Sequence, residues 1–399
     1  MSVGRDVRAP LNFRRVSDLP PYVFATVDQL KRDLRREGRD VVDLGFGNPD
    51  IPSPELAVEK LAEAAGKPAN HRYSVSRGIG QLRAAVAERY MRVFGVAVDP
   101  ETEIVATIGA KEGLAHLMWV LVEPGDVVVV PTPTYPIHAV APVLAGASVV
   151  SPRVTDGVDG IEAMVRTHRP RAVVASFPHN PTTTVVSQAE LQRLVDLALE
   201  HEFLLVHDFA YADIAFDGYQ PPSLLAAEGG LDCGVELYSL TKSFSMAGWR
   251  LGFVLGRPDV VAALGKLKSY LDYGTFQPIQ IAATVTLREA GDYPEEVCEI
   301  YRGRRDALCR GLVRAGWPVE PPLGTMFVWV PIPEPYRELG SLEVALRLAR
   351  EAGVAVSPGV GFGAGGEGHV RFALVENEHR IGQATRSIRR FLPGERAHG

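Results

Sequence analysis

Cysteine and long apolar runs are both scarce in this chain of 399 residues. Its three cysteines, Cys233, Cys298 and Cys309, are widely spaced and lack the paired spacing of a zinc site or a disulfide framework. No stretch approaches the roughly 18 uninterrupted apolar residues of a membrane span, and the N-terminus has no apolar run of signal-peptide length. We therefore expect a protein of a reducing, cytoplasmic compartment.

An excess of basic charge is also missing. The 42 lysines and arginines are interspersed with 48 acidic residues, which gives a formal net charge of -6. No basic stripe is available to follow a phosphate backbone, so nucleic acid is not an expected partner. Internal repeats and low-complexity tracts are absent too, and the length favours a large globular domain plus a smaller one.

Several catalytic motifs are absent. The sequence contains neither the Gly-x-Ser-x-Gly of nucleophile-elbow hydrolases nor the His-Glu-x-x-His of zinc enzymes, and we expect no catalytic metal. The segment Gly361 to Gly366 formally matches Gly-x-Gly-x-x-Gly. A predicted strand follows it, not the helix of a dinucleotide-binding unit, so we interpret it as a loop.

What the sequence does have is an α/β pattern. Between about residues 103 and 255, short β-branched runs alternate with longer helical stretches, which is typical of a mostly parallel sheet wrapped by helices. Ser187, followed by Glu190, predicts a capping box for a helix that extends to His201, and Lys111 to Val122 predicts another helix. The predicted strands are Ile104 to Ile108, Val127 to Val130, Ala172 to Phe177, Phe203 to His207, Glu236 to Leu240 and Gly252 to Leu255.

The two ends of the chain are expected to build the smaller domain. A helix is predicted over Tyr22 to Arg36 and a short strand over Val41 to Leu44. After a helical region that ends near Ala315, three further strands are predicted near residues 326–330, 354–357 and 370–374. We predict an N-terminal segment (1–45) that contributes to the small α+β domain, a large domain (46–290), a small C-terminal domain (291–399) and one shared cleft.

Polar residues follow several predicted strands, where open α/β sheets bind ligands. Asn180, Asp208 and Lys242 each come just after such a run, and Arg250 lies eight residues beyond the lysine. Taken singly, Lys242 and Arg250 also fit a solvated helix face, and Asp208 fits a helix cap. Their combination in order favours a functional site.

The stretch Ser239-Leu-Thr-Lys242-Ser-Phe-Ser-Met-Ala-Gly-Trp-Arg250 resembles the cofactor-lysine motif of the class I/II aminotransferases, which are fold type I enzymes dependent on pyridoxal 5'-phosphate. The resemblance covers nearly the whole chain. It implies the fold type I architecture, a Schiff base between pyridoxal 5'-phosphate and Lys242, and a homodimer with shared active sites. The other matching positions are Tyr73, Gly109, Ala110, Lys111, Tyr135, Asn180, Asp208, Tyr211 and Arg371.

The resemblance also implies a role for each residue around the cofactor ring. Lys242 would hold the cofactor and shuttle a proton, and Asp208 would keep the pyridine nitrogen protonated. Asn180 and Tyr211 would hydrogen-bond the phenolic oxygen. Tyr135 would stack on the ring.

For the cofactor phosphate, the family pattern points to backbone N–H groups at Gly109, Ala110 and Lys111. Ser239 and Arg250 would add a hydroxyl and a guanidinium. Relatives often carry serine or threonine where this chain has Ala110, so one side-chain contact is expected to be lost. Tyr73 would reach the phosphate of the neighbouring subunit.

For the substrate, Arg371 resembles the arginine that binds the α-carboxylate as a bidentate pair. Asn180 would assist it, and Gly47 would let the backbone approach the same carboxylate. Tyr22 either lines the substrate pocket or has only a packing role.

The reaction is narrowed by a closer resemblance to bacterial glutamate-pyruvate (alanine) aminotransferases. It predicts ping-pong transamination between an L-amino acid, alanine or glutamate, and pyruvate or 2-oxoglutarate. The alternatives are another fold type I reaction, such as an amino-acid oxidase or hydroxylase, and an aminotransferase of specialised metabolism acting on a larger amino acid. A further alternative is a transcription regulator that keeps this fold but has no enzymatic activity. Such a protein needs a DNA-binding domain, and only about 20 residues precede the first predicted helix, so we do not favour it. The matching segments are 20–24, 47–50, 107–116, 135–138 and 272–276.

Overall fold

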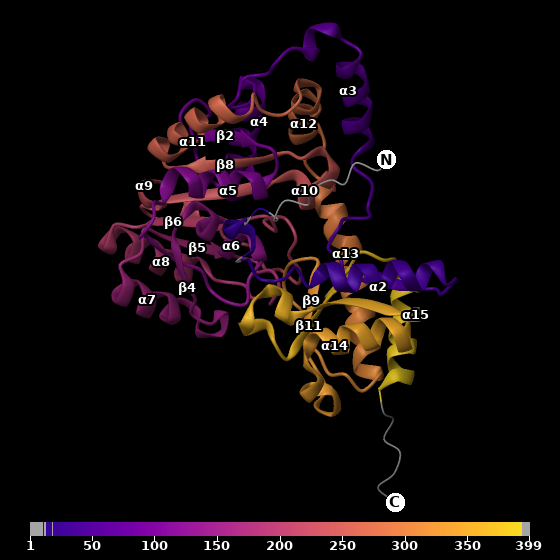
Figure 1. Cartoon of the computed structure of the whole chain (residues 1–399). Coiled ribbons are helices and arrows are strands. Elements are labelled where there is room, and N and C mark those ends of the chain that lie inside the picture. Colours follow the sequence, from indigo (N-terminus) through magenta and orange to yellow (C-terminus); the bar gives the residue numbers. More distant parts are fainter. Residues whose placement is uncertain (1–10, 12, 18, 393–399) are drawn as a thin grey trace, which may run out of the picture.

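Seven strands form the larger of two β-sheets in the computed structural model, which describes residues 11, 13–17 and 19–392 (Figure 1). All neighbouring strands are parallel except at β8 (Gly252–Gly256), which runs antiparallel to both β2 (Ile104–Thr107) and β7 (Gly234–Ser239). The central strands are buried along their whole length because helices cover both faces of the sheet. In sheet order, the strands are β2 (Ile104–Thr107), β8 (Gly252–Gly256), β7 (Gly234–Ser239), β6 (Leu204–Asp208), β5 (Ala172–Ser176), β3 (Val127–Val129) and β4 (Ser148–Val150).

The helix after β5 begins with the predicted capping box. Ser187 Oγ accepts from the Glu190 N–H, and the Glu190 carboxylate accepts from the Ser187 N–H at 2.8 Å. Among the described residues, no helix has both the length and the apolar character needed to cross a membrane. The helices of this part of the chain are α3 (Glu55–Ala65), α4 (Gly80–Phe94), α5 (Ala110–Leu121), α6 (Pro136–Ala145), α7 (Gly157–His168), α8 (Gln188–His201), α9 (Gly230–Cys233), α10 (Leu240–Ser243), α11 (Pro258–Leu271) and α12 (Gln277–Glu289).

The smaller sheet joins the two ends of the described chain. Its order is β1 (Val42–Leu44), β10 (Val354–Pro358), β11 (His369–Ala373) and β9 (Phe327–Pro331), and β1 is parallel to β10. In Figure 1 the indigo helix α2 (Phe24–Arg36) lies beside the yellow C-terminal elements. The remaining helices are α1 (Arg14–Ser17), α13 (Tyr293–Arg314), α14 (Gly340–Arg347) and α15 (Glu378–Phe391).

The predicted domain boundaries at 45/46 and 290/291 stay a prediction. Residues 1–10 of the N-terminal segment and 393–399 of the C-terminal one lie outside the described residues. The strand β1, which falls within the segment 1–45, is hydrogen-bonded into the smaller sheet.

Two local predictions differ from the structure. Strand β4 was not predicted, because only three residues form it and they are half-buried or exposed at the edge of the sheet. The strand predicted over Glu236 to Leu240 instead ends at Ser239, whose Oγ accepts from the Thr241 N–H at 3.2 Å and starts the one-turn helix α10. The segment Gly361 to Gly366 forms parts of two short 3-10 turns before β11, not a strand-to-helix crossover.

Candidate active site

One cavity of about 210 Å³ gathers residues from the ends of the large-sheet strands and from the smaller sheet. Asp208 is the last residue of β6, and Arg371 lies in the middle of β11. Most of the predicted site residues line this cavity, although hundreds of residues separate them in the chain. They are Tyr22, Gly47, Ala110, Lys111, Tyr135, Asn180, Asp208, Tyr211, Ser239, Lys242, Arg250 and Arg371.

Two predicted residues lie outside this lining. Gly109 precedes α5 with a φ of 78°, and a Cβ there would clash with the Arg250 guanidinium. Glycine therefore lets the guanidinium approach the first turn of α5. Tyr73 is 85% exposed and packs beside Tyr273, with ring centroids 4.8 Å apart, on the surface of the single chain.

Lys242 presents its amine inside the cavity. Its Nζ donates to the carbonyl oxygen of Gly47 at 2.7 Å. Burial, together with the positive charges of Arg371 and Arg250, lowers the pKa of Lys242 to about 7. A large fraction of this amine is therefore neutral near pH 7, which is the form that attacks a carbonyl carbon.

Asp208 is held by a histidine that the sequence analysis did not select. His138 Nε2 lies 2.8 Å from Asp208 Oδ2, and its Nδ1 lies 2.8 Å from Thr134 Oγ1. Because a carboxylate only accepts, Nε2 must carry a proton and donate it to Asp208. The second carboxylate oxygen accepts from the Ala210 N–H at 3.2 Å. His138 lies three residues after Tyr135 at the start of α6. Residues at this spacing lie on the same side of a helix, so the sequence could have placed His138 near the site.

Arg371 is oriented by three acceptors. Its Nη1 donates to Asn180 Oδ1 at 2.7 Å, and its Nη2 donates to the Gly45 carbonyl at 3.2 Å and to Ser357 Oγ at 3.3 Å. The guanidinium also lies 3.8 Å from the centroid of the Phe327 ring. Its Nε is buried and has no hydrogen-bond partner among the described residues. Burial lowers the pKa of Arg371 to about 10, so it remains charged at neutral pH and suits a carboxylate ligand.

Two tyrosines complete the polar wall. The ring centroid of Tyr135 lies 5.6 Å from Lys111 Nζ, and the Tyr211 ring packs edge-on against Phe327. Burial raises the pKa of both hydroxyls. Both side chains are therefore neutral near pH 7 and can donate hydrogen bonds.

Aromatic side chains close the cavity toward α2. Tyr22 packs edge-on against Phe24, which in turn packs against Phe362 with ring centroids 5.0 Å apart. Tyr22 thus both lines the cavity and packs against another aromatic residue. Sequence reasoning did not select the other residues of this apolar wall, Phe24, Phe46, Ile137, Phe327 and Phe362.

These residues meet the requirements of pyridoxal 5'-phosphate. Its aldehyde needs a neutral amine, which Lys242 offers, and its pyridinium needs a shielded carboxylate, which Asp208 offers. Its phosphate needs donors and positive charge. The open N–H groups of the first turn of α5 and the guanidinium of Arg250 lie together at the cavity wall.

Comparison with known proteins gives consistent matches over almost the whole chain. Residues 39–388 match the model of the family "Aminotransferase class I and II". The chain is 47% identical to the glutamate-pyruvate aminotransferase AlaC of Escherichia coli, over 96% of this chain and 94% of that protein. It is 40% identical to an LL-diaminopimelate aminotransferase of Desulforudis audaxviator, over 95% and 97% of the two chains. The solved structure of substrate-bound BacF from Bacillus subtilis has a TM-score of 0.90 at 32% identity and covers 96% of this chain and 98% of that one.

Proposed function

This chain belongs to the class I and II aminotransferases, and on that premise we propose that it transfers an amino group between L-alanine or L-glutamate and pyruvate or 2-oxoglutarate. It is a pyridoxal 5'-phosphate dependent aminotransferase with the fold type I architecture. The observation that supports the substrates is the 47% identity to a glutamate-pyruvate aminotransferase along almost the whole chain.

The bound cofactor supplies an electron sink for the negative charge that develops at the substrate Cα. Lys242 would hold the cofactor covalently and then move a proton to and from that carbon through Nζ, for which its lowered pKa suits it. Asp208, kept in place by His138, would hold a proton on the pyridine nitrogen. Asn180 Oδ1 is occupied by Arg371, which leaves Nδ2 free to donate to the phenolic oxygen, together with the Tyr211 hydroxyl.

The remaining roles follow from charge and position. Gly109, Ala110 and Lys111, at the start of α5, would hold the phosphate through backbone N–H groups, with Ser239 and Arg250 beside them. Tyr135 would stack on the ring. The loss of a side-chain hydroxyl at Ala110 leaves this backbone contact in place.

Substrate binding centres on Arg371, which would bind the α-carboxylate as a bidentate pair. The segment from Gly45 to Gly47 lies beside this arginine, and a Cβ at Gly47 would come within 2.6 Å of the Phe327 ring that packs under the guanidinium. Tyr22 and Phe24 would face the substrate side chain. An apolar wall favours a small uncharged side chain such as that of alanine.

A second candidate is transamination of a larger amino acid. It is favoured by the 40% identity to an LL-diaminopimelate aminotransferase over almost the whole chain. Such a substrate carries a second carboxylate and a second amino group, which must be paired when they leave water. The aromatic wall offers no partner for the second amino group, which alanine and glutamate lack, and this is why we place these two amino acids first.

The experiment follows the absorbance of the bound cofactor in the purified protein after addition of single amino acids, with no 2-oxo acid present. We expect L-alanine and L-glutamate to convert it to its aminated form, and pyruvate or 2-oxoglutarate to reverse the change. Conversion by LL-diaminopimelate alone would support the second candidate. Oxygen uptake without the aminated form would contradict transamination and support an oxidase.

We also propose that two chains form a homodimer with two-fold symmetry and share active sites. Tyr73 lies outside the cavity of its own chain, and aromatic residues of the neighbouring surface are exposed as well. A dimer would cover this apolar surface and bring Tyr73 to the phosphate of the partner. These exposed aromatic residues are Tyr73, Tyr270, Tyr273 and Phe276.

A further inference from the structure

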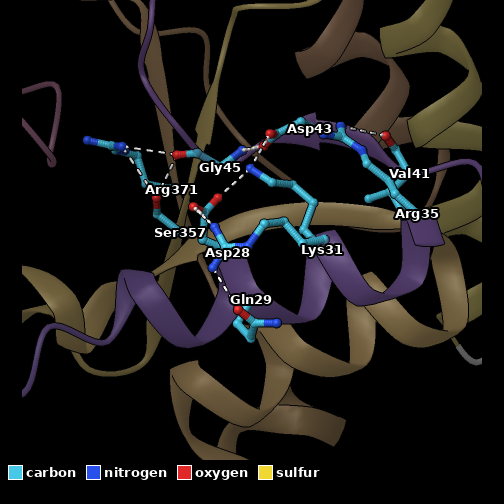
Figure 2. Close-up of polar contacts among 10 residues, drawn as sticks. Asp28, Gln29, Lys31, Arg35, Val41, Asp43, Gly45, Ser357 and Arg371 are labelled. Carbon is cyan, nitrogen blue, oxygen red and sulfur yellow. Dashed lines mark hydrogen bonds and ion pairs between the residues drawn. The ribbon is translucent and has the colours of Figure 1, made fainter.

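Lys31, on helix α2, ends in a partly buried ion cluster between that helix and strand β1 (Figure 2). Its Nζ lies 2.6 Å from Asp43 Oδ2 and 2.5 Å from Asp28 Oδ1. Its side chain is only 11% exposed and that of Asp43 is 21% exposed. Water and salt screen such a pair less than an exposed one, so it can fix the position of Asp43.

Asp43 in turn forms a hydrogen bond with the backbone of the next segment. Its Oδ1 accepts from the Gly45 N–H at 3.1 Å, while the Gly45 carbonyl accepts from Ser357 Oγ at 2.7 Å and from Arg371 Nη2 at 3.2 Å. In Figure 2, dashed lines link Lys31 to Asp43, Asp43 to Gly45, and Gly45 to Ser357 and Arg371. A continuous set of hydrogen bonds therefore connects Lys31 to Arg371.

The middle of this connection is a glycine, whose backbone has no Cβ to restrict it. The Asp43 carboxylate fixes the N–H of Gly45 and so helps to fix the direction of its carbonyl. Without Lys31, this carboxylate would turn toward water to recover solvation and release the N–H. The same segment continues to Gly47, whose carbonyl contacts Lys242.

We propose that Lys31 is a positioning residue for recognition of the substrate carboxylate, acting through Asp43 and Gly45 on Arg371. The proposal rests on the proposed function, in which Arg371 binds that carboxylate. Lys31 does not line the cavity and touches no reacting atom.

The test uses the full-length, cofactor-loaded protein and four variants. Lys31→Met removes the cation and keeps much of the apolar stem, while Lys31→Arg keeps the charge. Arg32→Met is the matched control, because Arg32 lies on the same helix and pairs with Asp28 at 2.9 Å, but it is 49% exposed and its hydrogen bonds go to Asp28 and Gln29. Asp43→Asn tests the next step of the connection at nearly constant volume.

Three small probes separate the effects. L-alanine carries both an amino group and a carboxylate, propionate carries only the carboxylate, and ethylamine only the amino group. We expect Lys31→Met to weaken binding of L-alanine about tenfold, with the limiting rate of the half-reaction changed less than about twofold. Propionate binding, measured by ligand-observed NMR, should weaken by a similar factor, and the rate with ethylamine should stay unchanged. Asp43→Asn should act in the same direction, and Lys31→Arg should recover most of the binding.

Three outcomes would each overturn the proposal. Arg32→Met could weaken L-alanine binding as much as Lys31→Met does, or Lys31→Met could leave propionate binding unchanged. Lys31→Met could also slow the reaction with ethylamine as much as it weakens L-alanine binding, which would make the effect general to the fold. If Lys31→Met does not fold, the same comparison is made with Asp43→Asn. A failure of the proposed function would be visible in the wild-type protein, which would then aminate no 2-oxo acid.

Discussion

Lys242 carries its amine in a place that disfavours the charged form. Burial and two neighbouring arginines act in the same direction, and the pKa falls from 10.5 to about 7. The protein gives up some stability at this position and obtains a nucleophile that is active near neutral pH.

This loss of stability makes the free energy of unfolding of the cofactor-free protein depend on pH. Between about pH 7 and 10.5, Lys242 is charged in the unfolded chain but largely neutral in the folded one. Unfolding therefore takes up a proton, and the stability of the wild type relative to Lys242→Met should increase as the pH rises through this window and level off below about 7. Urea denaturation of both proteins at a series of pH values measures the difference. A constant difference would contradict the lowered pKa.

At this scale the sequence predicts which residues gather but not how they pair. Lys242 and Asp208 could be selected because each follows a buried run that ends at the same edge of a sheet. The contact of Arg371 with Asn180 joins residues 191 positions apart, and no local pattern encodes it. The pairing of His138 with Asp208 was missed for the same reason, although the spacing of His138 from Tyr135 was visible.

Among the elements, α8 shows how a local signal succeeds. Its capping box depends only on two side chains three residues apart and on the backbone between them, so it was predicted from the sequence and is confirmed. Strand β4 shows the opposite case. Its three residues become a strand only because β3 lies beside them, and the antiparallel place of β8 between β2 and β7 likewise depends on distant partners.

The cap of α8 gives a prediction that concerns stability alone. Ser187→Ala should lower the free energy of unfolding by about 1 kcal/mol, because the N–H of Glu190 loses its acceptor. Ser187→Asp keeps an accepting oxygen and should retain the wild-type value. Chemical denaturation of the two variants measures this, and transamination should be unaffected because Ser187 is exposed and does not line the cavity. Equal stability of Ser187→Ala and wild type would show that the cap contributes nothing.

At the scale of the whole molecule, the exposed position of Tyr73 gives a test of the proposed sharing of active sites. In the proposed homodimer, Lys242→Ala and Tyr73→Ala would each damage both sites. If Tyr73 serves the partner, a mixed dimer contains one intact site and one doubly altered site. Random exchange of subunits should then restore about a quarter of the wild-type activity, since half of the dimers are mixed.

Activity is measured after the two variants are unfolded and refolded together, with each variant refolded alone as the baseline. A mixture that only averages the two parents would contradict site sharing. The residue pattern around Tyr73 could not decide whether it serves the partner chain. A surface tyrosine is compatible with contact to water and with contact to a second subunit.

The parallel pairing of β1 with β10 has a consequence for how the protein is made. Val42 leaves the ribosome long before its partner Val354 is synthesised. The last strand of the seven-stranded sheet along the chain ends at Gly256, so this sheet can form before the partner strand of β1 has been synthesised. Arg371, which lines the cavity, is synthesised later still, because β11 follows β10 in the chain. A chain that stops before β10 therefore lacks both the partner strand of β1 and the arginine that we propose binds the substrate carboxylate.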